Sequence, residues 1–234
     1  MTSVISSSPR ALGRMSAAIV HEISQPLAAM EASLAAAELS LQAAPTKTAT
    51  RIETARNLIR RMQRTTKHLK SFSRKEEGLL EEIDAVQVVE SALDLVQPRA
   101  RAVGVAPRLI RPEGPMQVRA GRVRLEQVLV NLLLNAMDAV EGQATGQIEV
   151  TLEQAAGELR IAVRDTGSGI APEDLARVTE PFFSTKTNSE GLGLGLAISQ
   201  AILAEFGGRF EICSTQGTGT VMTAILPRYQ EGAI

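Results

Sequence analysis

The chain of 234 residues is poor in cysteine and in aromatic residues, with one Cys, no Trp, one Tyr and five Phe. The lone Cys213 excludes an internal disulfide and a cysteine-based metal site. The core must therefore consist mainly of aliphatic side chains and Met. We expect a reducing, cytoplasmic setting.

Long apolar runs and an excess of one charge are also missing. No run approaches the roughly 20 apolar residues that a membrane-spanning helix requires, and the first residues lack a secretory signal pattern. The 25 basic and 26 acidic residues give a net charge of −1, which argues against general affinity for nucleic acid or anionic membranes. The 44% of hydrophobic and 22% of charged residues are typical of a soluble globular protein.

Residues 10–76 carry the pattern of two helices, with residues 1–9 as a tail or the remnant of an upstream linker. Apolar side chains recur at spacings of three and four residues. They include Leu27, Met30, Leu34, Ala37 and Leu41 in the first helix and Ile52, Ala55, Ile59 and Met62 in the second. A break at Pro45 predicts an antiparallel hairpin. Because two helices cannot cover both apolar stripes, we expect a dimer that completes a four-helix bundle.

After a linker at 77–84, residues 85–230 mix helices and strands. We expect helices at 86–96, 122–140 and 193–206, and strands at 103–110, 147–154, 158–165, 209–214 and 219–226. Gly157 and Gly217 mark hairpin turns. Because strands and helices do not alternate strictly, the pattern indicates an α+β sandwich, with one mixed sheet and helices on one face. The chain is thus expected to be multidomain, an all-α hairpin followed by this sandwich.

His21 is followed by Glu22, Gln25 and Pro26 in the first predicted helix. An adjacent carboxylate can keep one imidazole nitrogen protonated and leave the other as a nucleophile. Gln25 lies one turn farther along and can hydrogen-bond a water or a phosphoryl oxygen. Pro26 costs about 3 kcal/mol within a helix, which a purely structural helix rarely tolerates. A helical His is more often structural, so the interpretation of His21 depends on the rest of the chain.

Two further segments offer ligands for a nucleotide. Asn131 and Asn135 share one face of a helix, and two amide oxygens one turn apart can ligate Mg²⁺, although such a face can equally be a polar surface. Asp165 ends a predicted strand and can accept a hydrogen bond from an exocyclic amine. Gly167 and Gly169 would let a planar ring approach the backbone, but this glycine pattern is also common in turns.

A glycine-rich stretch containing Gly191, Gly193, Gly195 and Leu196 opens a predicted helix. Helix N-termini bind phosphate through free N–H groups and the helix dipole. The stretch matches neither a Walker loop nor a dinucleotide-binding fingerprint. Lys186 precedes it and could meet phosphate charge, although a single Lys in a loop is usually only solvated.

Taken together, these segments resemble the core of a bacterial sensor histidine kinase over nearly the whole chain. The segment His21–Leu27 is similar to the phospho-acceptor box of the subgroup that contains oxygen and dicarboxylate sensors. The other boxes of the family are matched by Asn131–Ala139 (N box), Asp165–Gly169 (first glycine box), Phe182–Lys186 (F box), Gly191–Leu196 (second glycine box) and Gly217–Thr220 (late strand motif). The resemblance implies a dimerisation and phosphotransfer hairpin and an ATP-binding domain of the gyrase, chaperone, kinase and mismatch-repair (GHKL) superfamily.

For the hairpin, the resemblance implies that His21 accepts the γ-phosphoryl group of ATP. Glu22 would orient His21 and take its proton, and Gln25 would position water when the protein acts as a phosphatase. The expected partners are the receiver domain of a response regulator and a second copy of the chain. The expected location is the cytoplasm, as a soluble protein or as the cytoplasmic part of a membrane-anchored sensor.

For the second domain, the resemblance implies an ATP site that uses Mg²⁺. Asn135 would ligate the metal, Asn131 would face the phosphates, and Lys186 would contact them. Asp165 would recognise the adenine amine, and Thr220 would help to bind adenine through water.

Two alternatives belong to other functional classes. A GHKL ATPase that works as a conformational switch would carry a Glu in place of Asn131, since an amide cannot act as a general base. A catalytically inactive dimeric scaffold would lack His21, Asn135 or Asp165, and all three are present.

Overall fold

The computed structural model describes residues 28–37, 48, 50–56, 59, 80–110, 113–155, 157–184 and 193–228. They belong to two compact units, a helical unit before residue 76 and an α+β unit after it. Within these described ranges, no helix is both long enough and apolar enough to cross a membrane.

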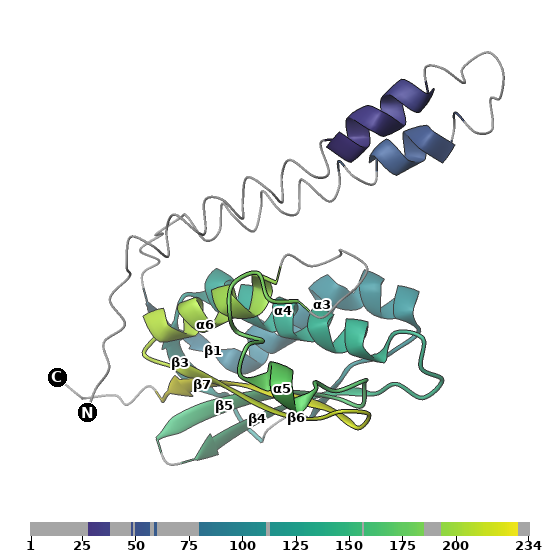
Figure 1. Cartoon of the computed structure of the whole chain (residues 1–234). Helices are drawn as coiled ribbons and strands as arrows, with labels where there is room; N and C mark the ends of the chain where they lie inside the picture. The colour runs from purple at the N-terminus through teal and green to yellow at the C-terminus, as the bar shows by residue number, and fades with distance from the viewer. Residues whose placement is uncertain are drawn as a thin grey trace. The chain divides into compact units, whose positions relative to one another are not determined.

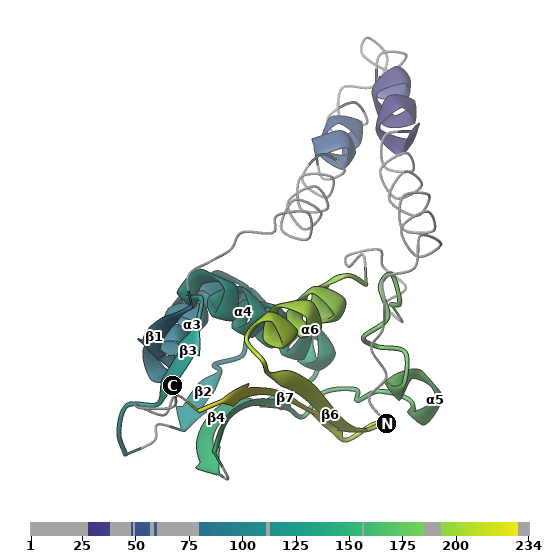
Figure 2. The ribbon, with the colours of Figure 1, turned by 90° about the vertical axis from the view of Figure 1, so that its left-hand side faces the viewer.

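Residues 28–37 and 50–56 of the first unit are helical and lie side by side (Figures 1 and 2). The Arg51 guanidinium donates a hydrogen bond to the carbonyl oxygen of Ala36, which ties the second helix to the end of the first. The described part of this unit is therefore a pair of packed helices, as the apolar spacing predicts.

The apolar side chains of this helical pair divide between the contact and the surface. Ala37 and Ala55 are buried, whereas Leu34 and Ile52 are 45% and 40% exposed. Small side chains at the contact let the two backbones approach closely. The larger apolar side chains are left at the surface.

The second unit is built on a five-stranded mixed sheet with the strand order β2-β4-β5-β7-β6. Its strands are β2 (Arg108–Ile110), β4 (Ile148–Ala155), β5 (Glu158–Asp165), β6 (Arg209–Thr215) and β7 (Gly219–Pro227). Strands β2 and β4 are parallel, and the other pairs are antiparallel. This confirms the predicted mixed sheet, with strand ends that differ from the prediction by one residue at most, except in β2.

Three helices, α3 (Ala85–Val103), α4 (Arg122–Val140) and α6 (Gly195–Glu205), cover one face of this sheet (Figure 2). The short helix α5 (Pro172–Leu175) follows β5. Helix α4 lies at the centre and contacts α3, α6 and the sheet. Its core residues recur at helical spacing and are Leu125, Val128, Leu129, Leu132, Leu133, Ala136, Met137 and Val140. This placement confirms the prediction of helices on one face.

A second, two-stranded sheet was not predicted. Strand β1 (Glu81–Asp84), which the sequence assigns to the linker, pairs with β3 (Gln117–Ala120). The Asp84 carboxylate accepts N–H groups from Val86 and Met116, so it caps α3 and joins the two segments. Strands of four residues are too short to show a clear alternation of apolar and polar positions.

Two predicted boundaries near Pro98 are wrong. Helix α3 runs through Pro98 to Val103 and ends at Gly104, whose φ of 80° suits glycine. Pro98 removes one backbone hydrogen bond, but Val96 and Ala100 are buried on either side of it, and this packing outweighs the loss. Since residue 103 is helical, the strand predicted at 103–110 shrinks to β2.

Candidate functional site

Three neighbouring strands carry a polar side chain at the same end of the sheet. Asp165 of β5 pairs with Thr220 of β7, which in turn pairs with Ser214 of β6. Directly opposed residues of antiparallel strands point to the same face, which here is the face that the helices cover. Asp165 and Thr220 are only 5% and 4% exposed. The hydrophobic core thus ends in a polar row of two buried residues and the half-buried Ser214.

Within the described residues, the Asp165 carboxylate makes its two hydrogen bonds through one oxygen. Its Oδ1 accepts the N–H of Gly167 at 2.8 Å and that of Thr220 at 3.3 Å. Burial raises the pKa of Asp165, and the two N–H bonds oppose that rise. Among the described residues no cationic side chain pairs with it, so Oδ2 remains as an acceptor for a donor from outside the chain.

The glycines after Asp165 are required by packing. A Cβ at Gly167 would overlap the Ala139 backbone near the end of α4, and one at Gly169, where φ is 65°, would overlap the Thr215 carbonyl. The loop between them is joined to α4 because the Ser168 N–H donates to the Ala139 carbonyl at 3.0 Å. The two glycines therefore let the loop fit between α4 and the β6–β7 turn. The sequence alone suggested a different role for them, the close approach of a planar ring.

A second cluster joins α4 to the beginning of α6. The Asn131 Nδ2 donates to Ser199 Oγ at 3.0 Å, and Ser199 is 1% exposed. The amide of Asn131 also fills the space that a side chain at Gly195 would take. Helix α6 starts at Gly195, followed by half-buried Leu196, and no side chain caps its first turn. Its first N–H groups and its positive dipole end suit an anion.

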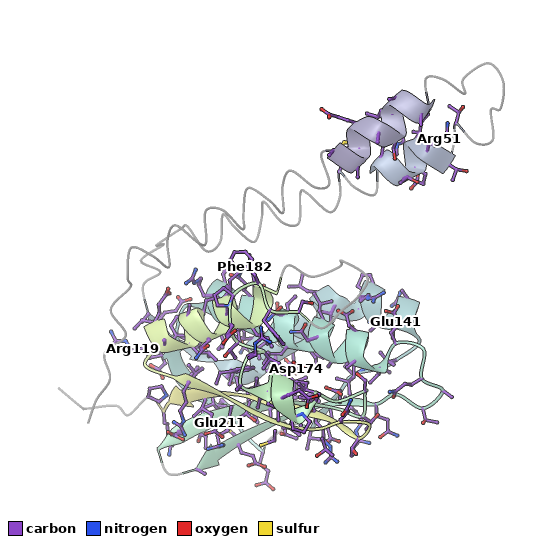
Figure 3. The ribbon with its side chains drawn as sticks, viewed as in Figure 1. Arg51, Arg119, Glu141, Asp174, Phe182 and Glu211 are labelled. Atoms are coloured by element: carbon purple, nitrogen blue, oxygen red, sulfur yellow. The ribbon has the colours of Figure 1, made fainter. Side chains whose placement is uncertain are left out.

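The F-box residues are held against the start of α6. The Phe182 N–H donates to the Gly193 carbonyl at 3.0 Å, beside the beginning of the helix (Figure 3). Both residues have positive φ, 69° at Phe182 and 62° at Gly193, and a Cβ at Gly193 would overlap the Phe183 carbonyl. The Arg177 guanidinium lies 4.4 Å from the centre of the Phe183 ring. The positive φ of Gly193 and the overlap of a Cβ there with the Phe183 carbonyl explain why position 193 requires glycine.

One face of α4 connects the two clusters. Asn131, half-buried Asn135 and Ala139 follow at steps of four residues. The first contacts Gly195 and the last contacts Gly167. At 1.5 Å per residue, these contacts are about 12 Å apart along the helix, which is the length scale of a nucleoside triphosphate. The site is elongated, with an anion-binding helix start at one end and a buried carboxylate at the other.

The chain is similar to known proteins. Residues 120–230 match the family described as histidine kinase-, DNA gyrase B-, and HSP90-like ATPase. The C4-dicarboxylate transport sensor protein DctB of Pseudomonas aeruginosa is 39% identical over 222 residues, which cover 93% of this chain and 36% of DctB. DctB of Rhizobium meliloti is 38% identical, with 86% of this chain and 32% of that protein covered. The chain thus spans about a third of the length of these relatives.

Solved structures agree with the sequence comparison. The catalytic domain of histidine kinase ThkA matches with a TM-score of 0.57 and 29% identity, covering 64% of this chain and 95% of that one. The structure of ThkA in complex with the response regulator TrrA matches 93% of this chain and 62% of that one, with a TM-score of 0.76 and 26% identity. The chain belongs to the two-component histidine kinases. Its α+β unit has the fold of a GHKL ATPase.

Most of the residues predicted for the kinase's ATP site lie within the described ranges. They are Asn131, Asn135, Asp165, Gly167, Gly169, Gly193, Gly195, Leu196 and Thr220. The other predicted residues lie outside the described ranges. They are His21, Glu22, Gln25, Lys186 and Gly191.

Sequence reasoning missed two serines of this kinase domain. Ser199 is one helical turn after Gly195, and a single polar residue at that step on a buried helix face was a usable signal. Ser214 accepts the Ile170 N–H at 2.8 Å and lies 2.9 Å from the Thr220 hydroxyl. Its alternation with apolar Ile212 and Phe210 places it on the inner face, but nothing in the sequence pairs it with Thr220.

Proposed function

We propose that this chain is the transmitter core of a sensor histidine kinase, a protein-histidine kinase that phosphorylates His21 from ATP. The phosphoryl group then passes to an aspartate of a response regulator. The observation that carries the proposal is one face of α4. At one end of this face Asn131 contacts the start of α6, and at the other end Ala139 contacts the loop after Asp165. The complex of ThkA with a response regulator supports the proposed partner.

The base end of the site suits adenine. Asp165 keeps Oδ2 as an acceptor and can take a hydrogen bond from the exocyclic amine. The Thr220 hydroxyl lies on the neighbouring strand in the same row, where it can bind the base through a water. At the other end, the first N–H groups of α6 can donate to phosphate oxygens, and Lys186 supplies a positive charge nearby in sequence.

The residues of α4 fit a magnesium ion at the phosphate end. Amide oxygens are hard ligands of the kind that Mg²⁺ accepts. As the resemblance to the kinase family implies, we assign the metal to Asn135 and the phosphates to Asn131. When bound, Mg²⁺ neutralises phosphate charge during phosphoryl transfer.

In the reaction we propose, the free imidazole nitrogen of His21 attacks the γ-phosphorus. A nitrogen–phosphorus bond forms, the bond to the bridging oxygen breaks, and ADP leaves. Glu22 holds the imidazole and takes its proton. The receiver aspartate then displaces His21 from phosphorus, and Gln25 positions a water when the acyl phosphate on the regulator is hydrolysed. Because Asn131 stands where a hydrolytic relative has Glu, transfer to water is disfavoured.

We assign residues 10–76 to dimerisation and phosphotransfer and residues 85–230 to ATP binding, joined by a linker. The exposed Leu34 and Ile52 support a homodimer because a four-helix bundle would cover them. The names of the DctB relatives support the subgroup of dicarboxylate and oxygen sensors. We place the chain in the cytoplasm, where ATP and response regulators are found.

The proposal is tested by incubating the protein with γ-labelled ATP and Mg²⁺. We expect acid-labile, alkali-stable label on the wild type and none on His21→Ala. His68→Ala is the matched control, since His68 is the other histidine of the chain, and it should keep the label. Release of free phosphate without labelled protein would favour the ATPase switch. Absence of both label and ATP binding would favour the inactive scaffold.

A further inference from the structure

The amide of Asn131 is held from two sides by one helix. Its Nδ2 donates to Ser199 Oγ at 3.0 Å. A side chain at Gly195 would meet the Oδ1, Cγ and Nδ2 atoms of the same amide. Gly195 and Ser199 are one turn apart on α6 and so share a face. A hydrogen bond and a steric contact therefore fix the position of this amide.

The chemistry of an amide makes that position important. An Asn side chain has two N–H donors on Nδ2 and an acceptor on Oδ1. When one N–H is bound to Ser199, the second has a fixed direction about 120° from the first, as planar amide geometry requires. It can then donate to a phosphoryl oxygen. The bond to Ser199 thus holds the amide at the start of α6, where its other N–H is left for a ligand.

Ser199 is placed to hold the amide in this position. It is 1% exposed, so water does not compete for the bond. Among the described residues, the bond to Asn131 is its one side-chain hydrogen bond. A buried hydroxyl without that bond would be costly, so each partner needs the other.

We propose that Ser199 is a positioning residue of the ATP site, which holds the Asn131 amide within reach of the phosphate group. The inference rests on the proposed function because it requires a nucleotide with its phosphates at the start of α6. Ser199 itself does not touch the nucleotide. It acts by holding the Asn131 amide in place.

The test compares ATP affinity with adenosine affinity. In Ser199→Ala and Ser199→Val, we expect ATP to bind about 5- to 10-fold more weakly, as for the loss of one hydrogen bond between neutral groups. Adenosine should bind as in the wild type, because the Asp165 end is untouched. Thr has nearly the same shape as Val but keeps a hydroxyl, so Ser199→Thr should restore most of the ATP affinity.

Ser91→Ala is the matched control. Ser91 Oγ donates to Glu126 Oε2 at 2.6 Å, so it ties α3 to α4 much as Ser199 ties α6 to α4. It lies on another helix pair and should leave ATP affinity unchanged. A double-mutant cycle with Asn131→Ala should show that loss of Ser199 costs little ATP affinity once Asn131 is absent.

The outcomes separate the inference from the proposed function. If wild-type protein binds no ATP, the proposed function fails and the inference fails with it. If wild-type protein binds ATP and Ser199→Val binds it equally well, the inference alone is overturned. Equal weakening of ATP and adenosine, or additive effects of Ser199 and Asn131, would show a merely structural serine and would also overturn it.

Discussion

Strand β5 begins and ends with a carboxylate, and the two carboxylates behave in opposite ways. Glu158, on the outer face of the sheet, is hydrogen-bonded by Arg209 at 3.0 Å, and this bond lowers its pKa. Asp165, on the inner face at the other end, has its pKa raised by burial. One carboxylate is paired with a cation at the surface, whereas the other is buried without one among the described residues.

The surroundings of the two carboxylates explain this difference. Glu158 belongs to an outer cluster with Arg160, Arg209 and Glu211, in which Arg160 and Glu211 approach to 2.6 Å. Figure 3 shows Glu211 on the sheet, away from the helices. Such exposed pairs contribute little to stability. Burial of a carboxylate whose partners are N–H groups alone lowers the folding stability. Since stability does not explain such a group, its presence is consistent with ligand binding.

The largest effect is expected from Asp165→Asn. The amide keeps an acceptor for the Gly167 and Thr220 N–H groups, but it offers a donor where Oδ2 stood. ATP should bind about 10- to 100-fold more weakly, as for the loss of a hydrogen bond to a charged group. Folding stability should stay equal or rise, because a buried charge is removed. Calorimetric titration and urea unfolding measure both quantities, and Glu158→Gln should bind ATP normally. Loss of stability in Asp165→Asn would contradict this interpretation.

A large effect is also expected at the phosphate end, from Gly195→Ala. The new methyl group would overlap the Asn131 amide, and such overpacking costs about 1–3 kcal/mol. We expect ATP affinity to fall about 10-fold or the helix start to shift. Gly114→Ala is the control, since a Cβ there meets nothing within 4 Å. Equal behaviour of the two variants in ATP titration would show that the contact is not needed.

A smaller effect is expected from pH, and its sign should differ between the two carboxylates. The raised pKa of Asp165 favours its neutral form in the folded state, so its contribution to stability is present below the unfolded pKa and is lost as pH rises through the folded pKa. The lowered pKa of Glu158 has the opposite effect, because its contribution is present above the unfolded pKa and lost as pH falls through the folded pKa. Urea unfolding of Asp165→Asn and Glu158→Gln between acid and neutral pH should show opposite slopes relative to the wild type. Slopes of the same sign would refute the comparison.

The smallest effect is expected from Arg160→Ala in the outer cluster. Removing a partly exposed ion pair should change the free energy of unfolding by less than about 1 kcal/mol, and ATP affinity should not change. Thermal unfolding with and without ATP would check this. A loss of ATP affinity would mean that the outer face influences the site through the sheet.

The sequence by itself determined the main elements and the residue types of the site. Helix α4 matches its predicted bounds because its apolar spacing is long and regular, and β5 matches because it alternates over eight residues. Asp165 and Asn131 were predicted because their positions at a strand end and on a helix face are local properties. The helical hairpin followed from the same periodicity, although only part of it lies within the described residues.

Only the tertiary structure decided which residues meet. The continuation of α3 through Pro98 depends on packing by Val96 and Ala100, and β1 exists because a distant β3 pairs with it. The bond between Asn131 and Ser199 joins residues 68 positions apart. Local propensity does not predict such contacts, since they depend on where helices and strands pack in the folded chain.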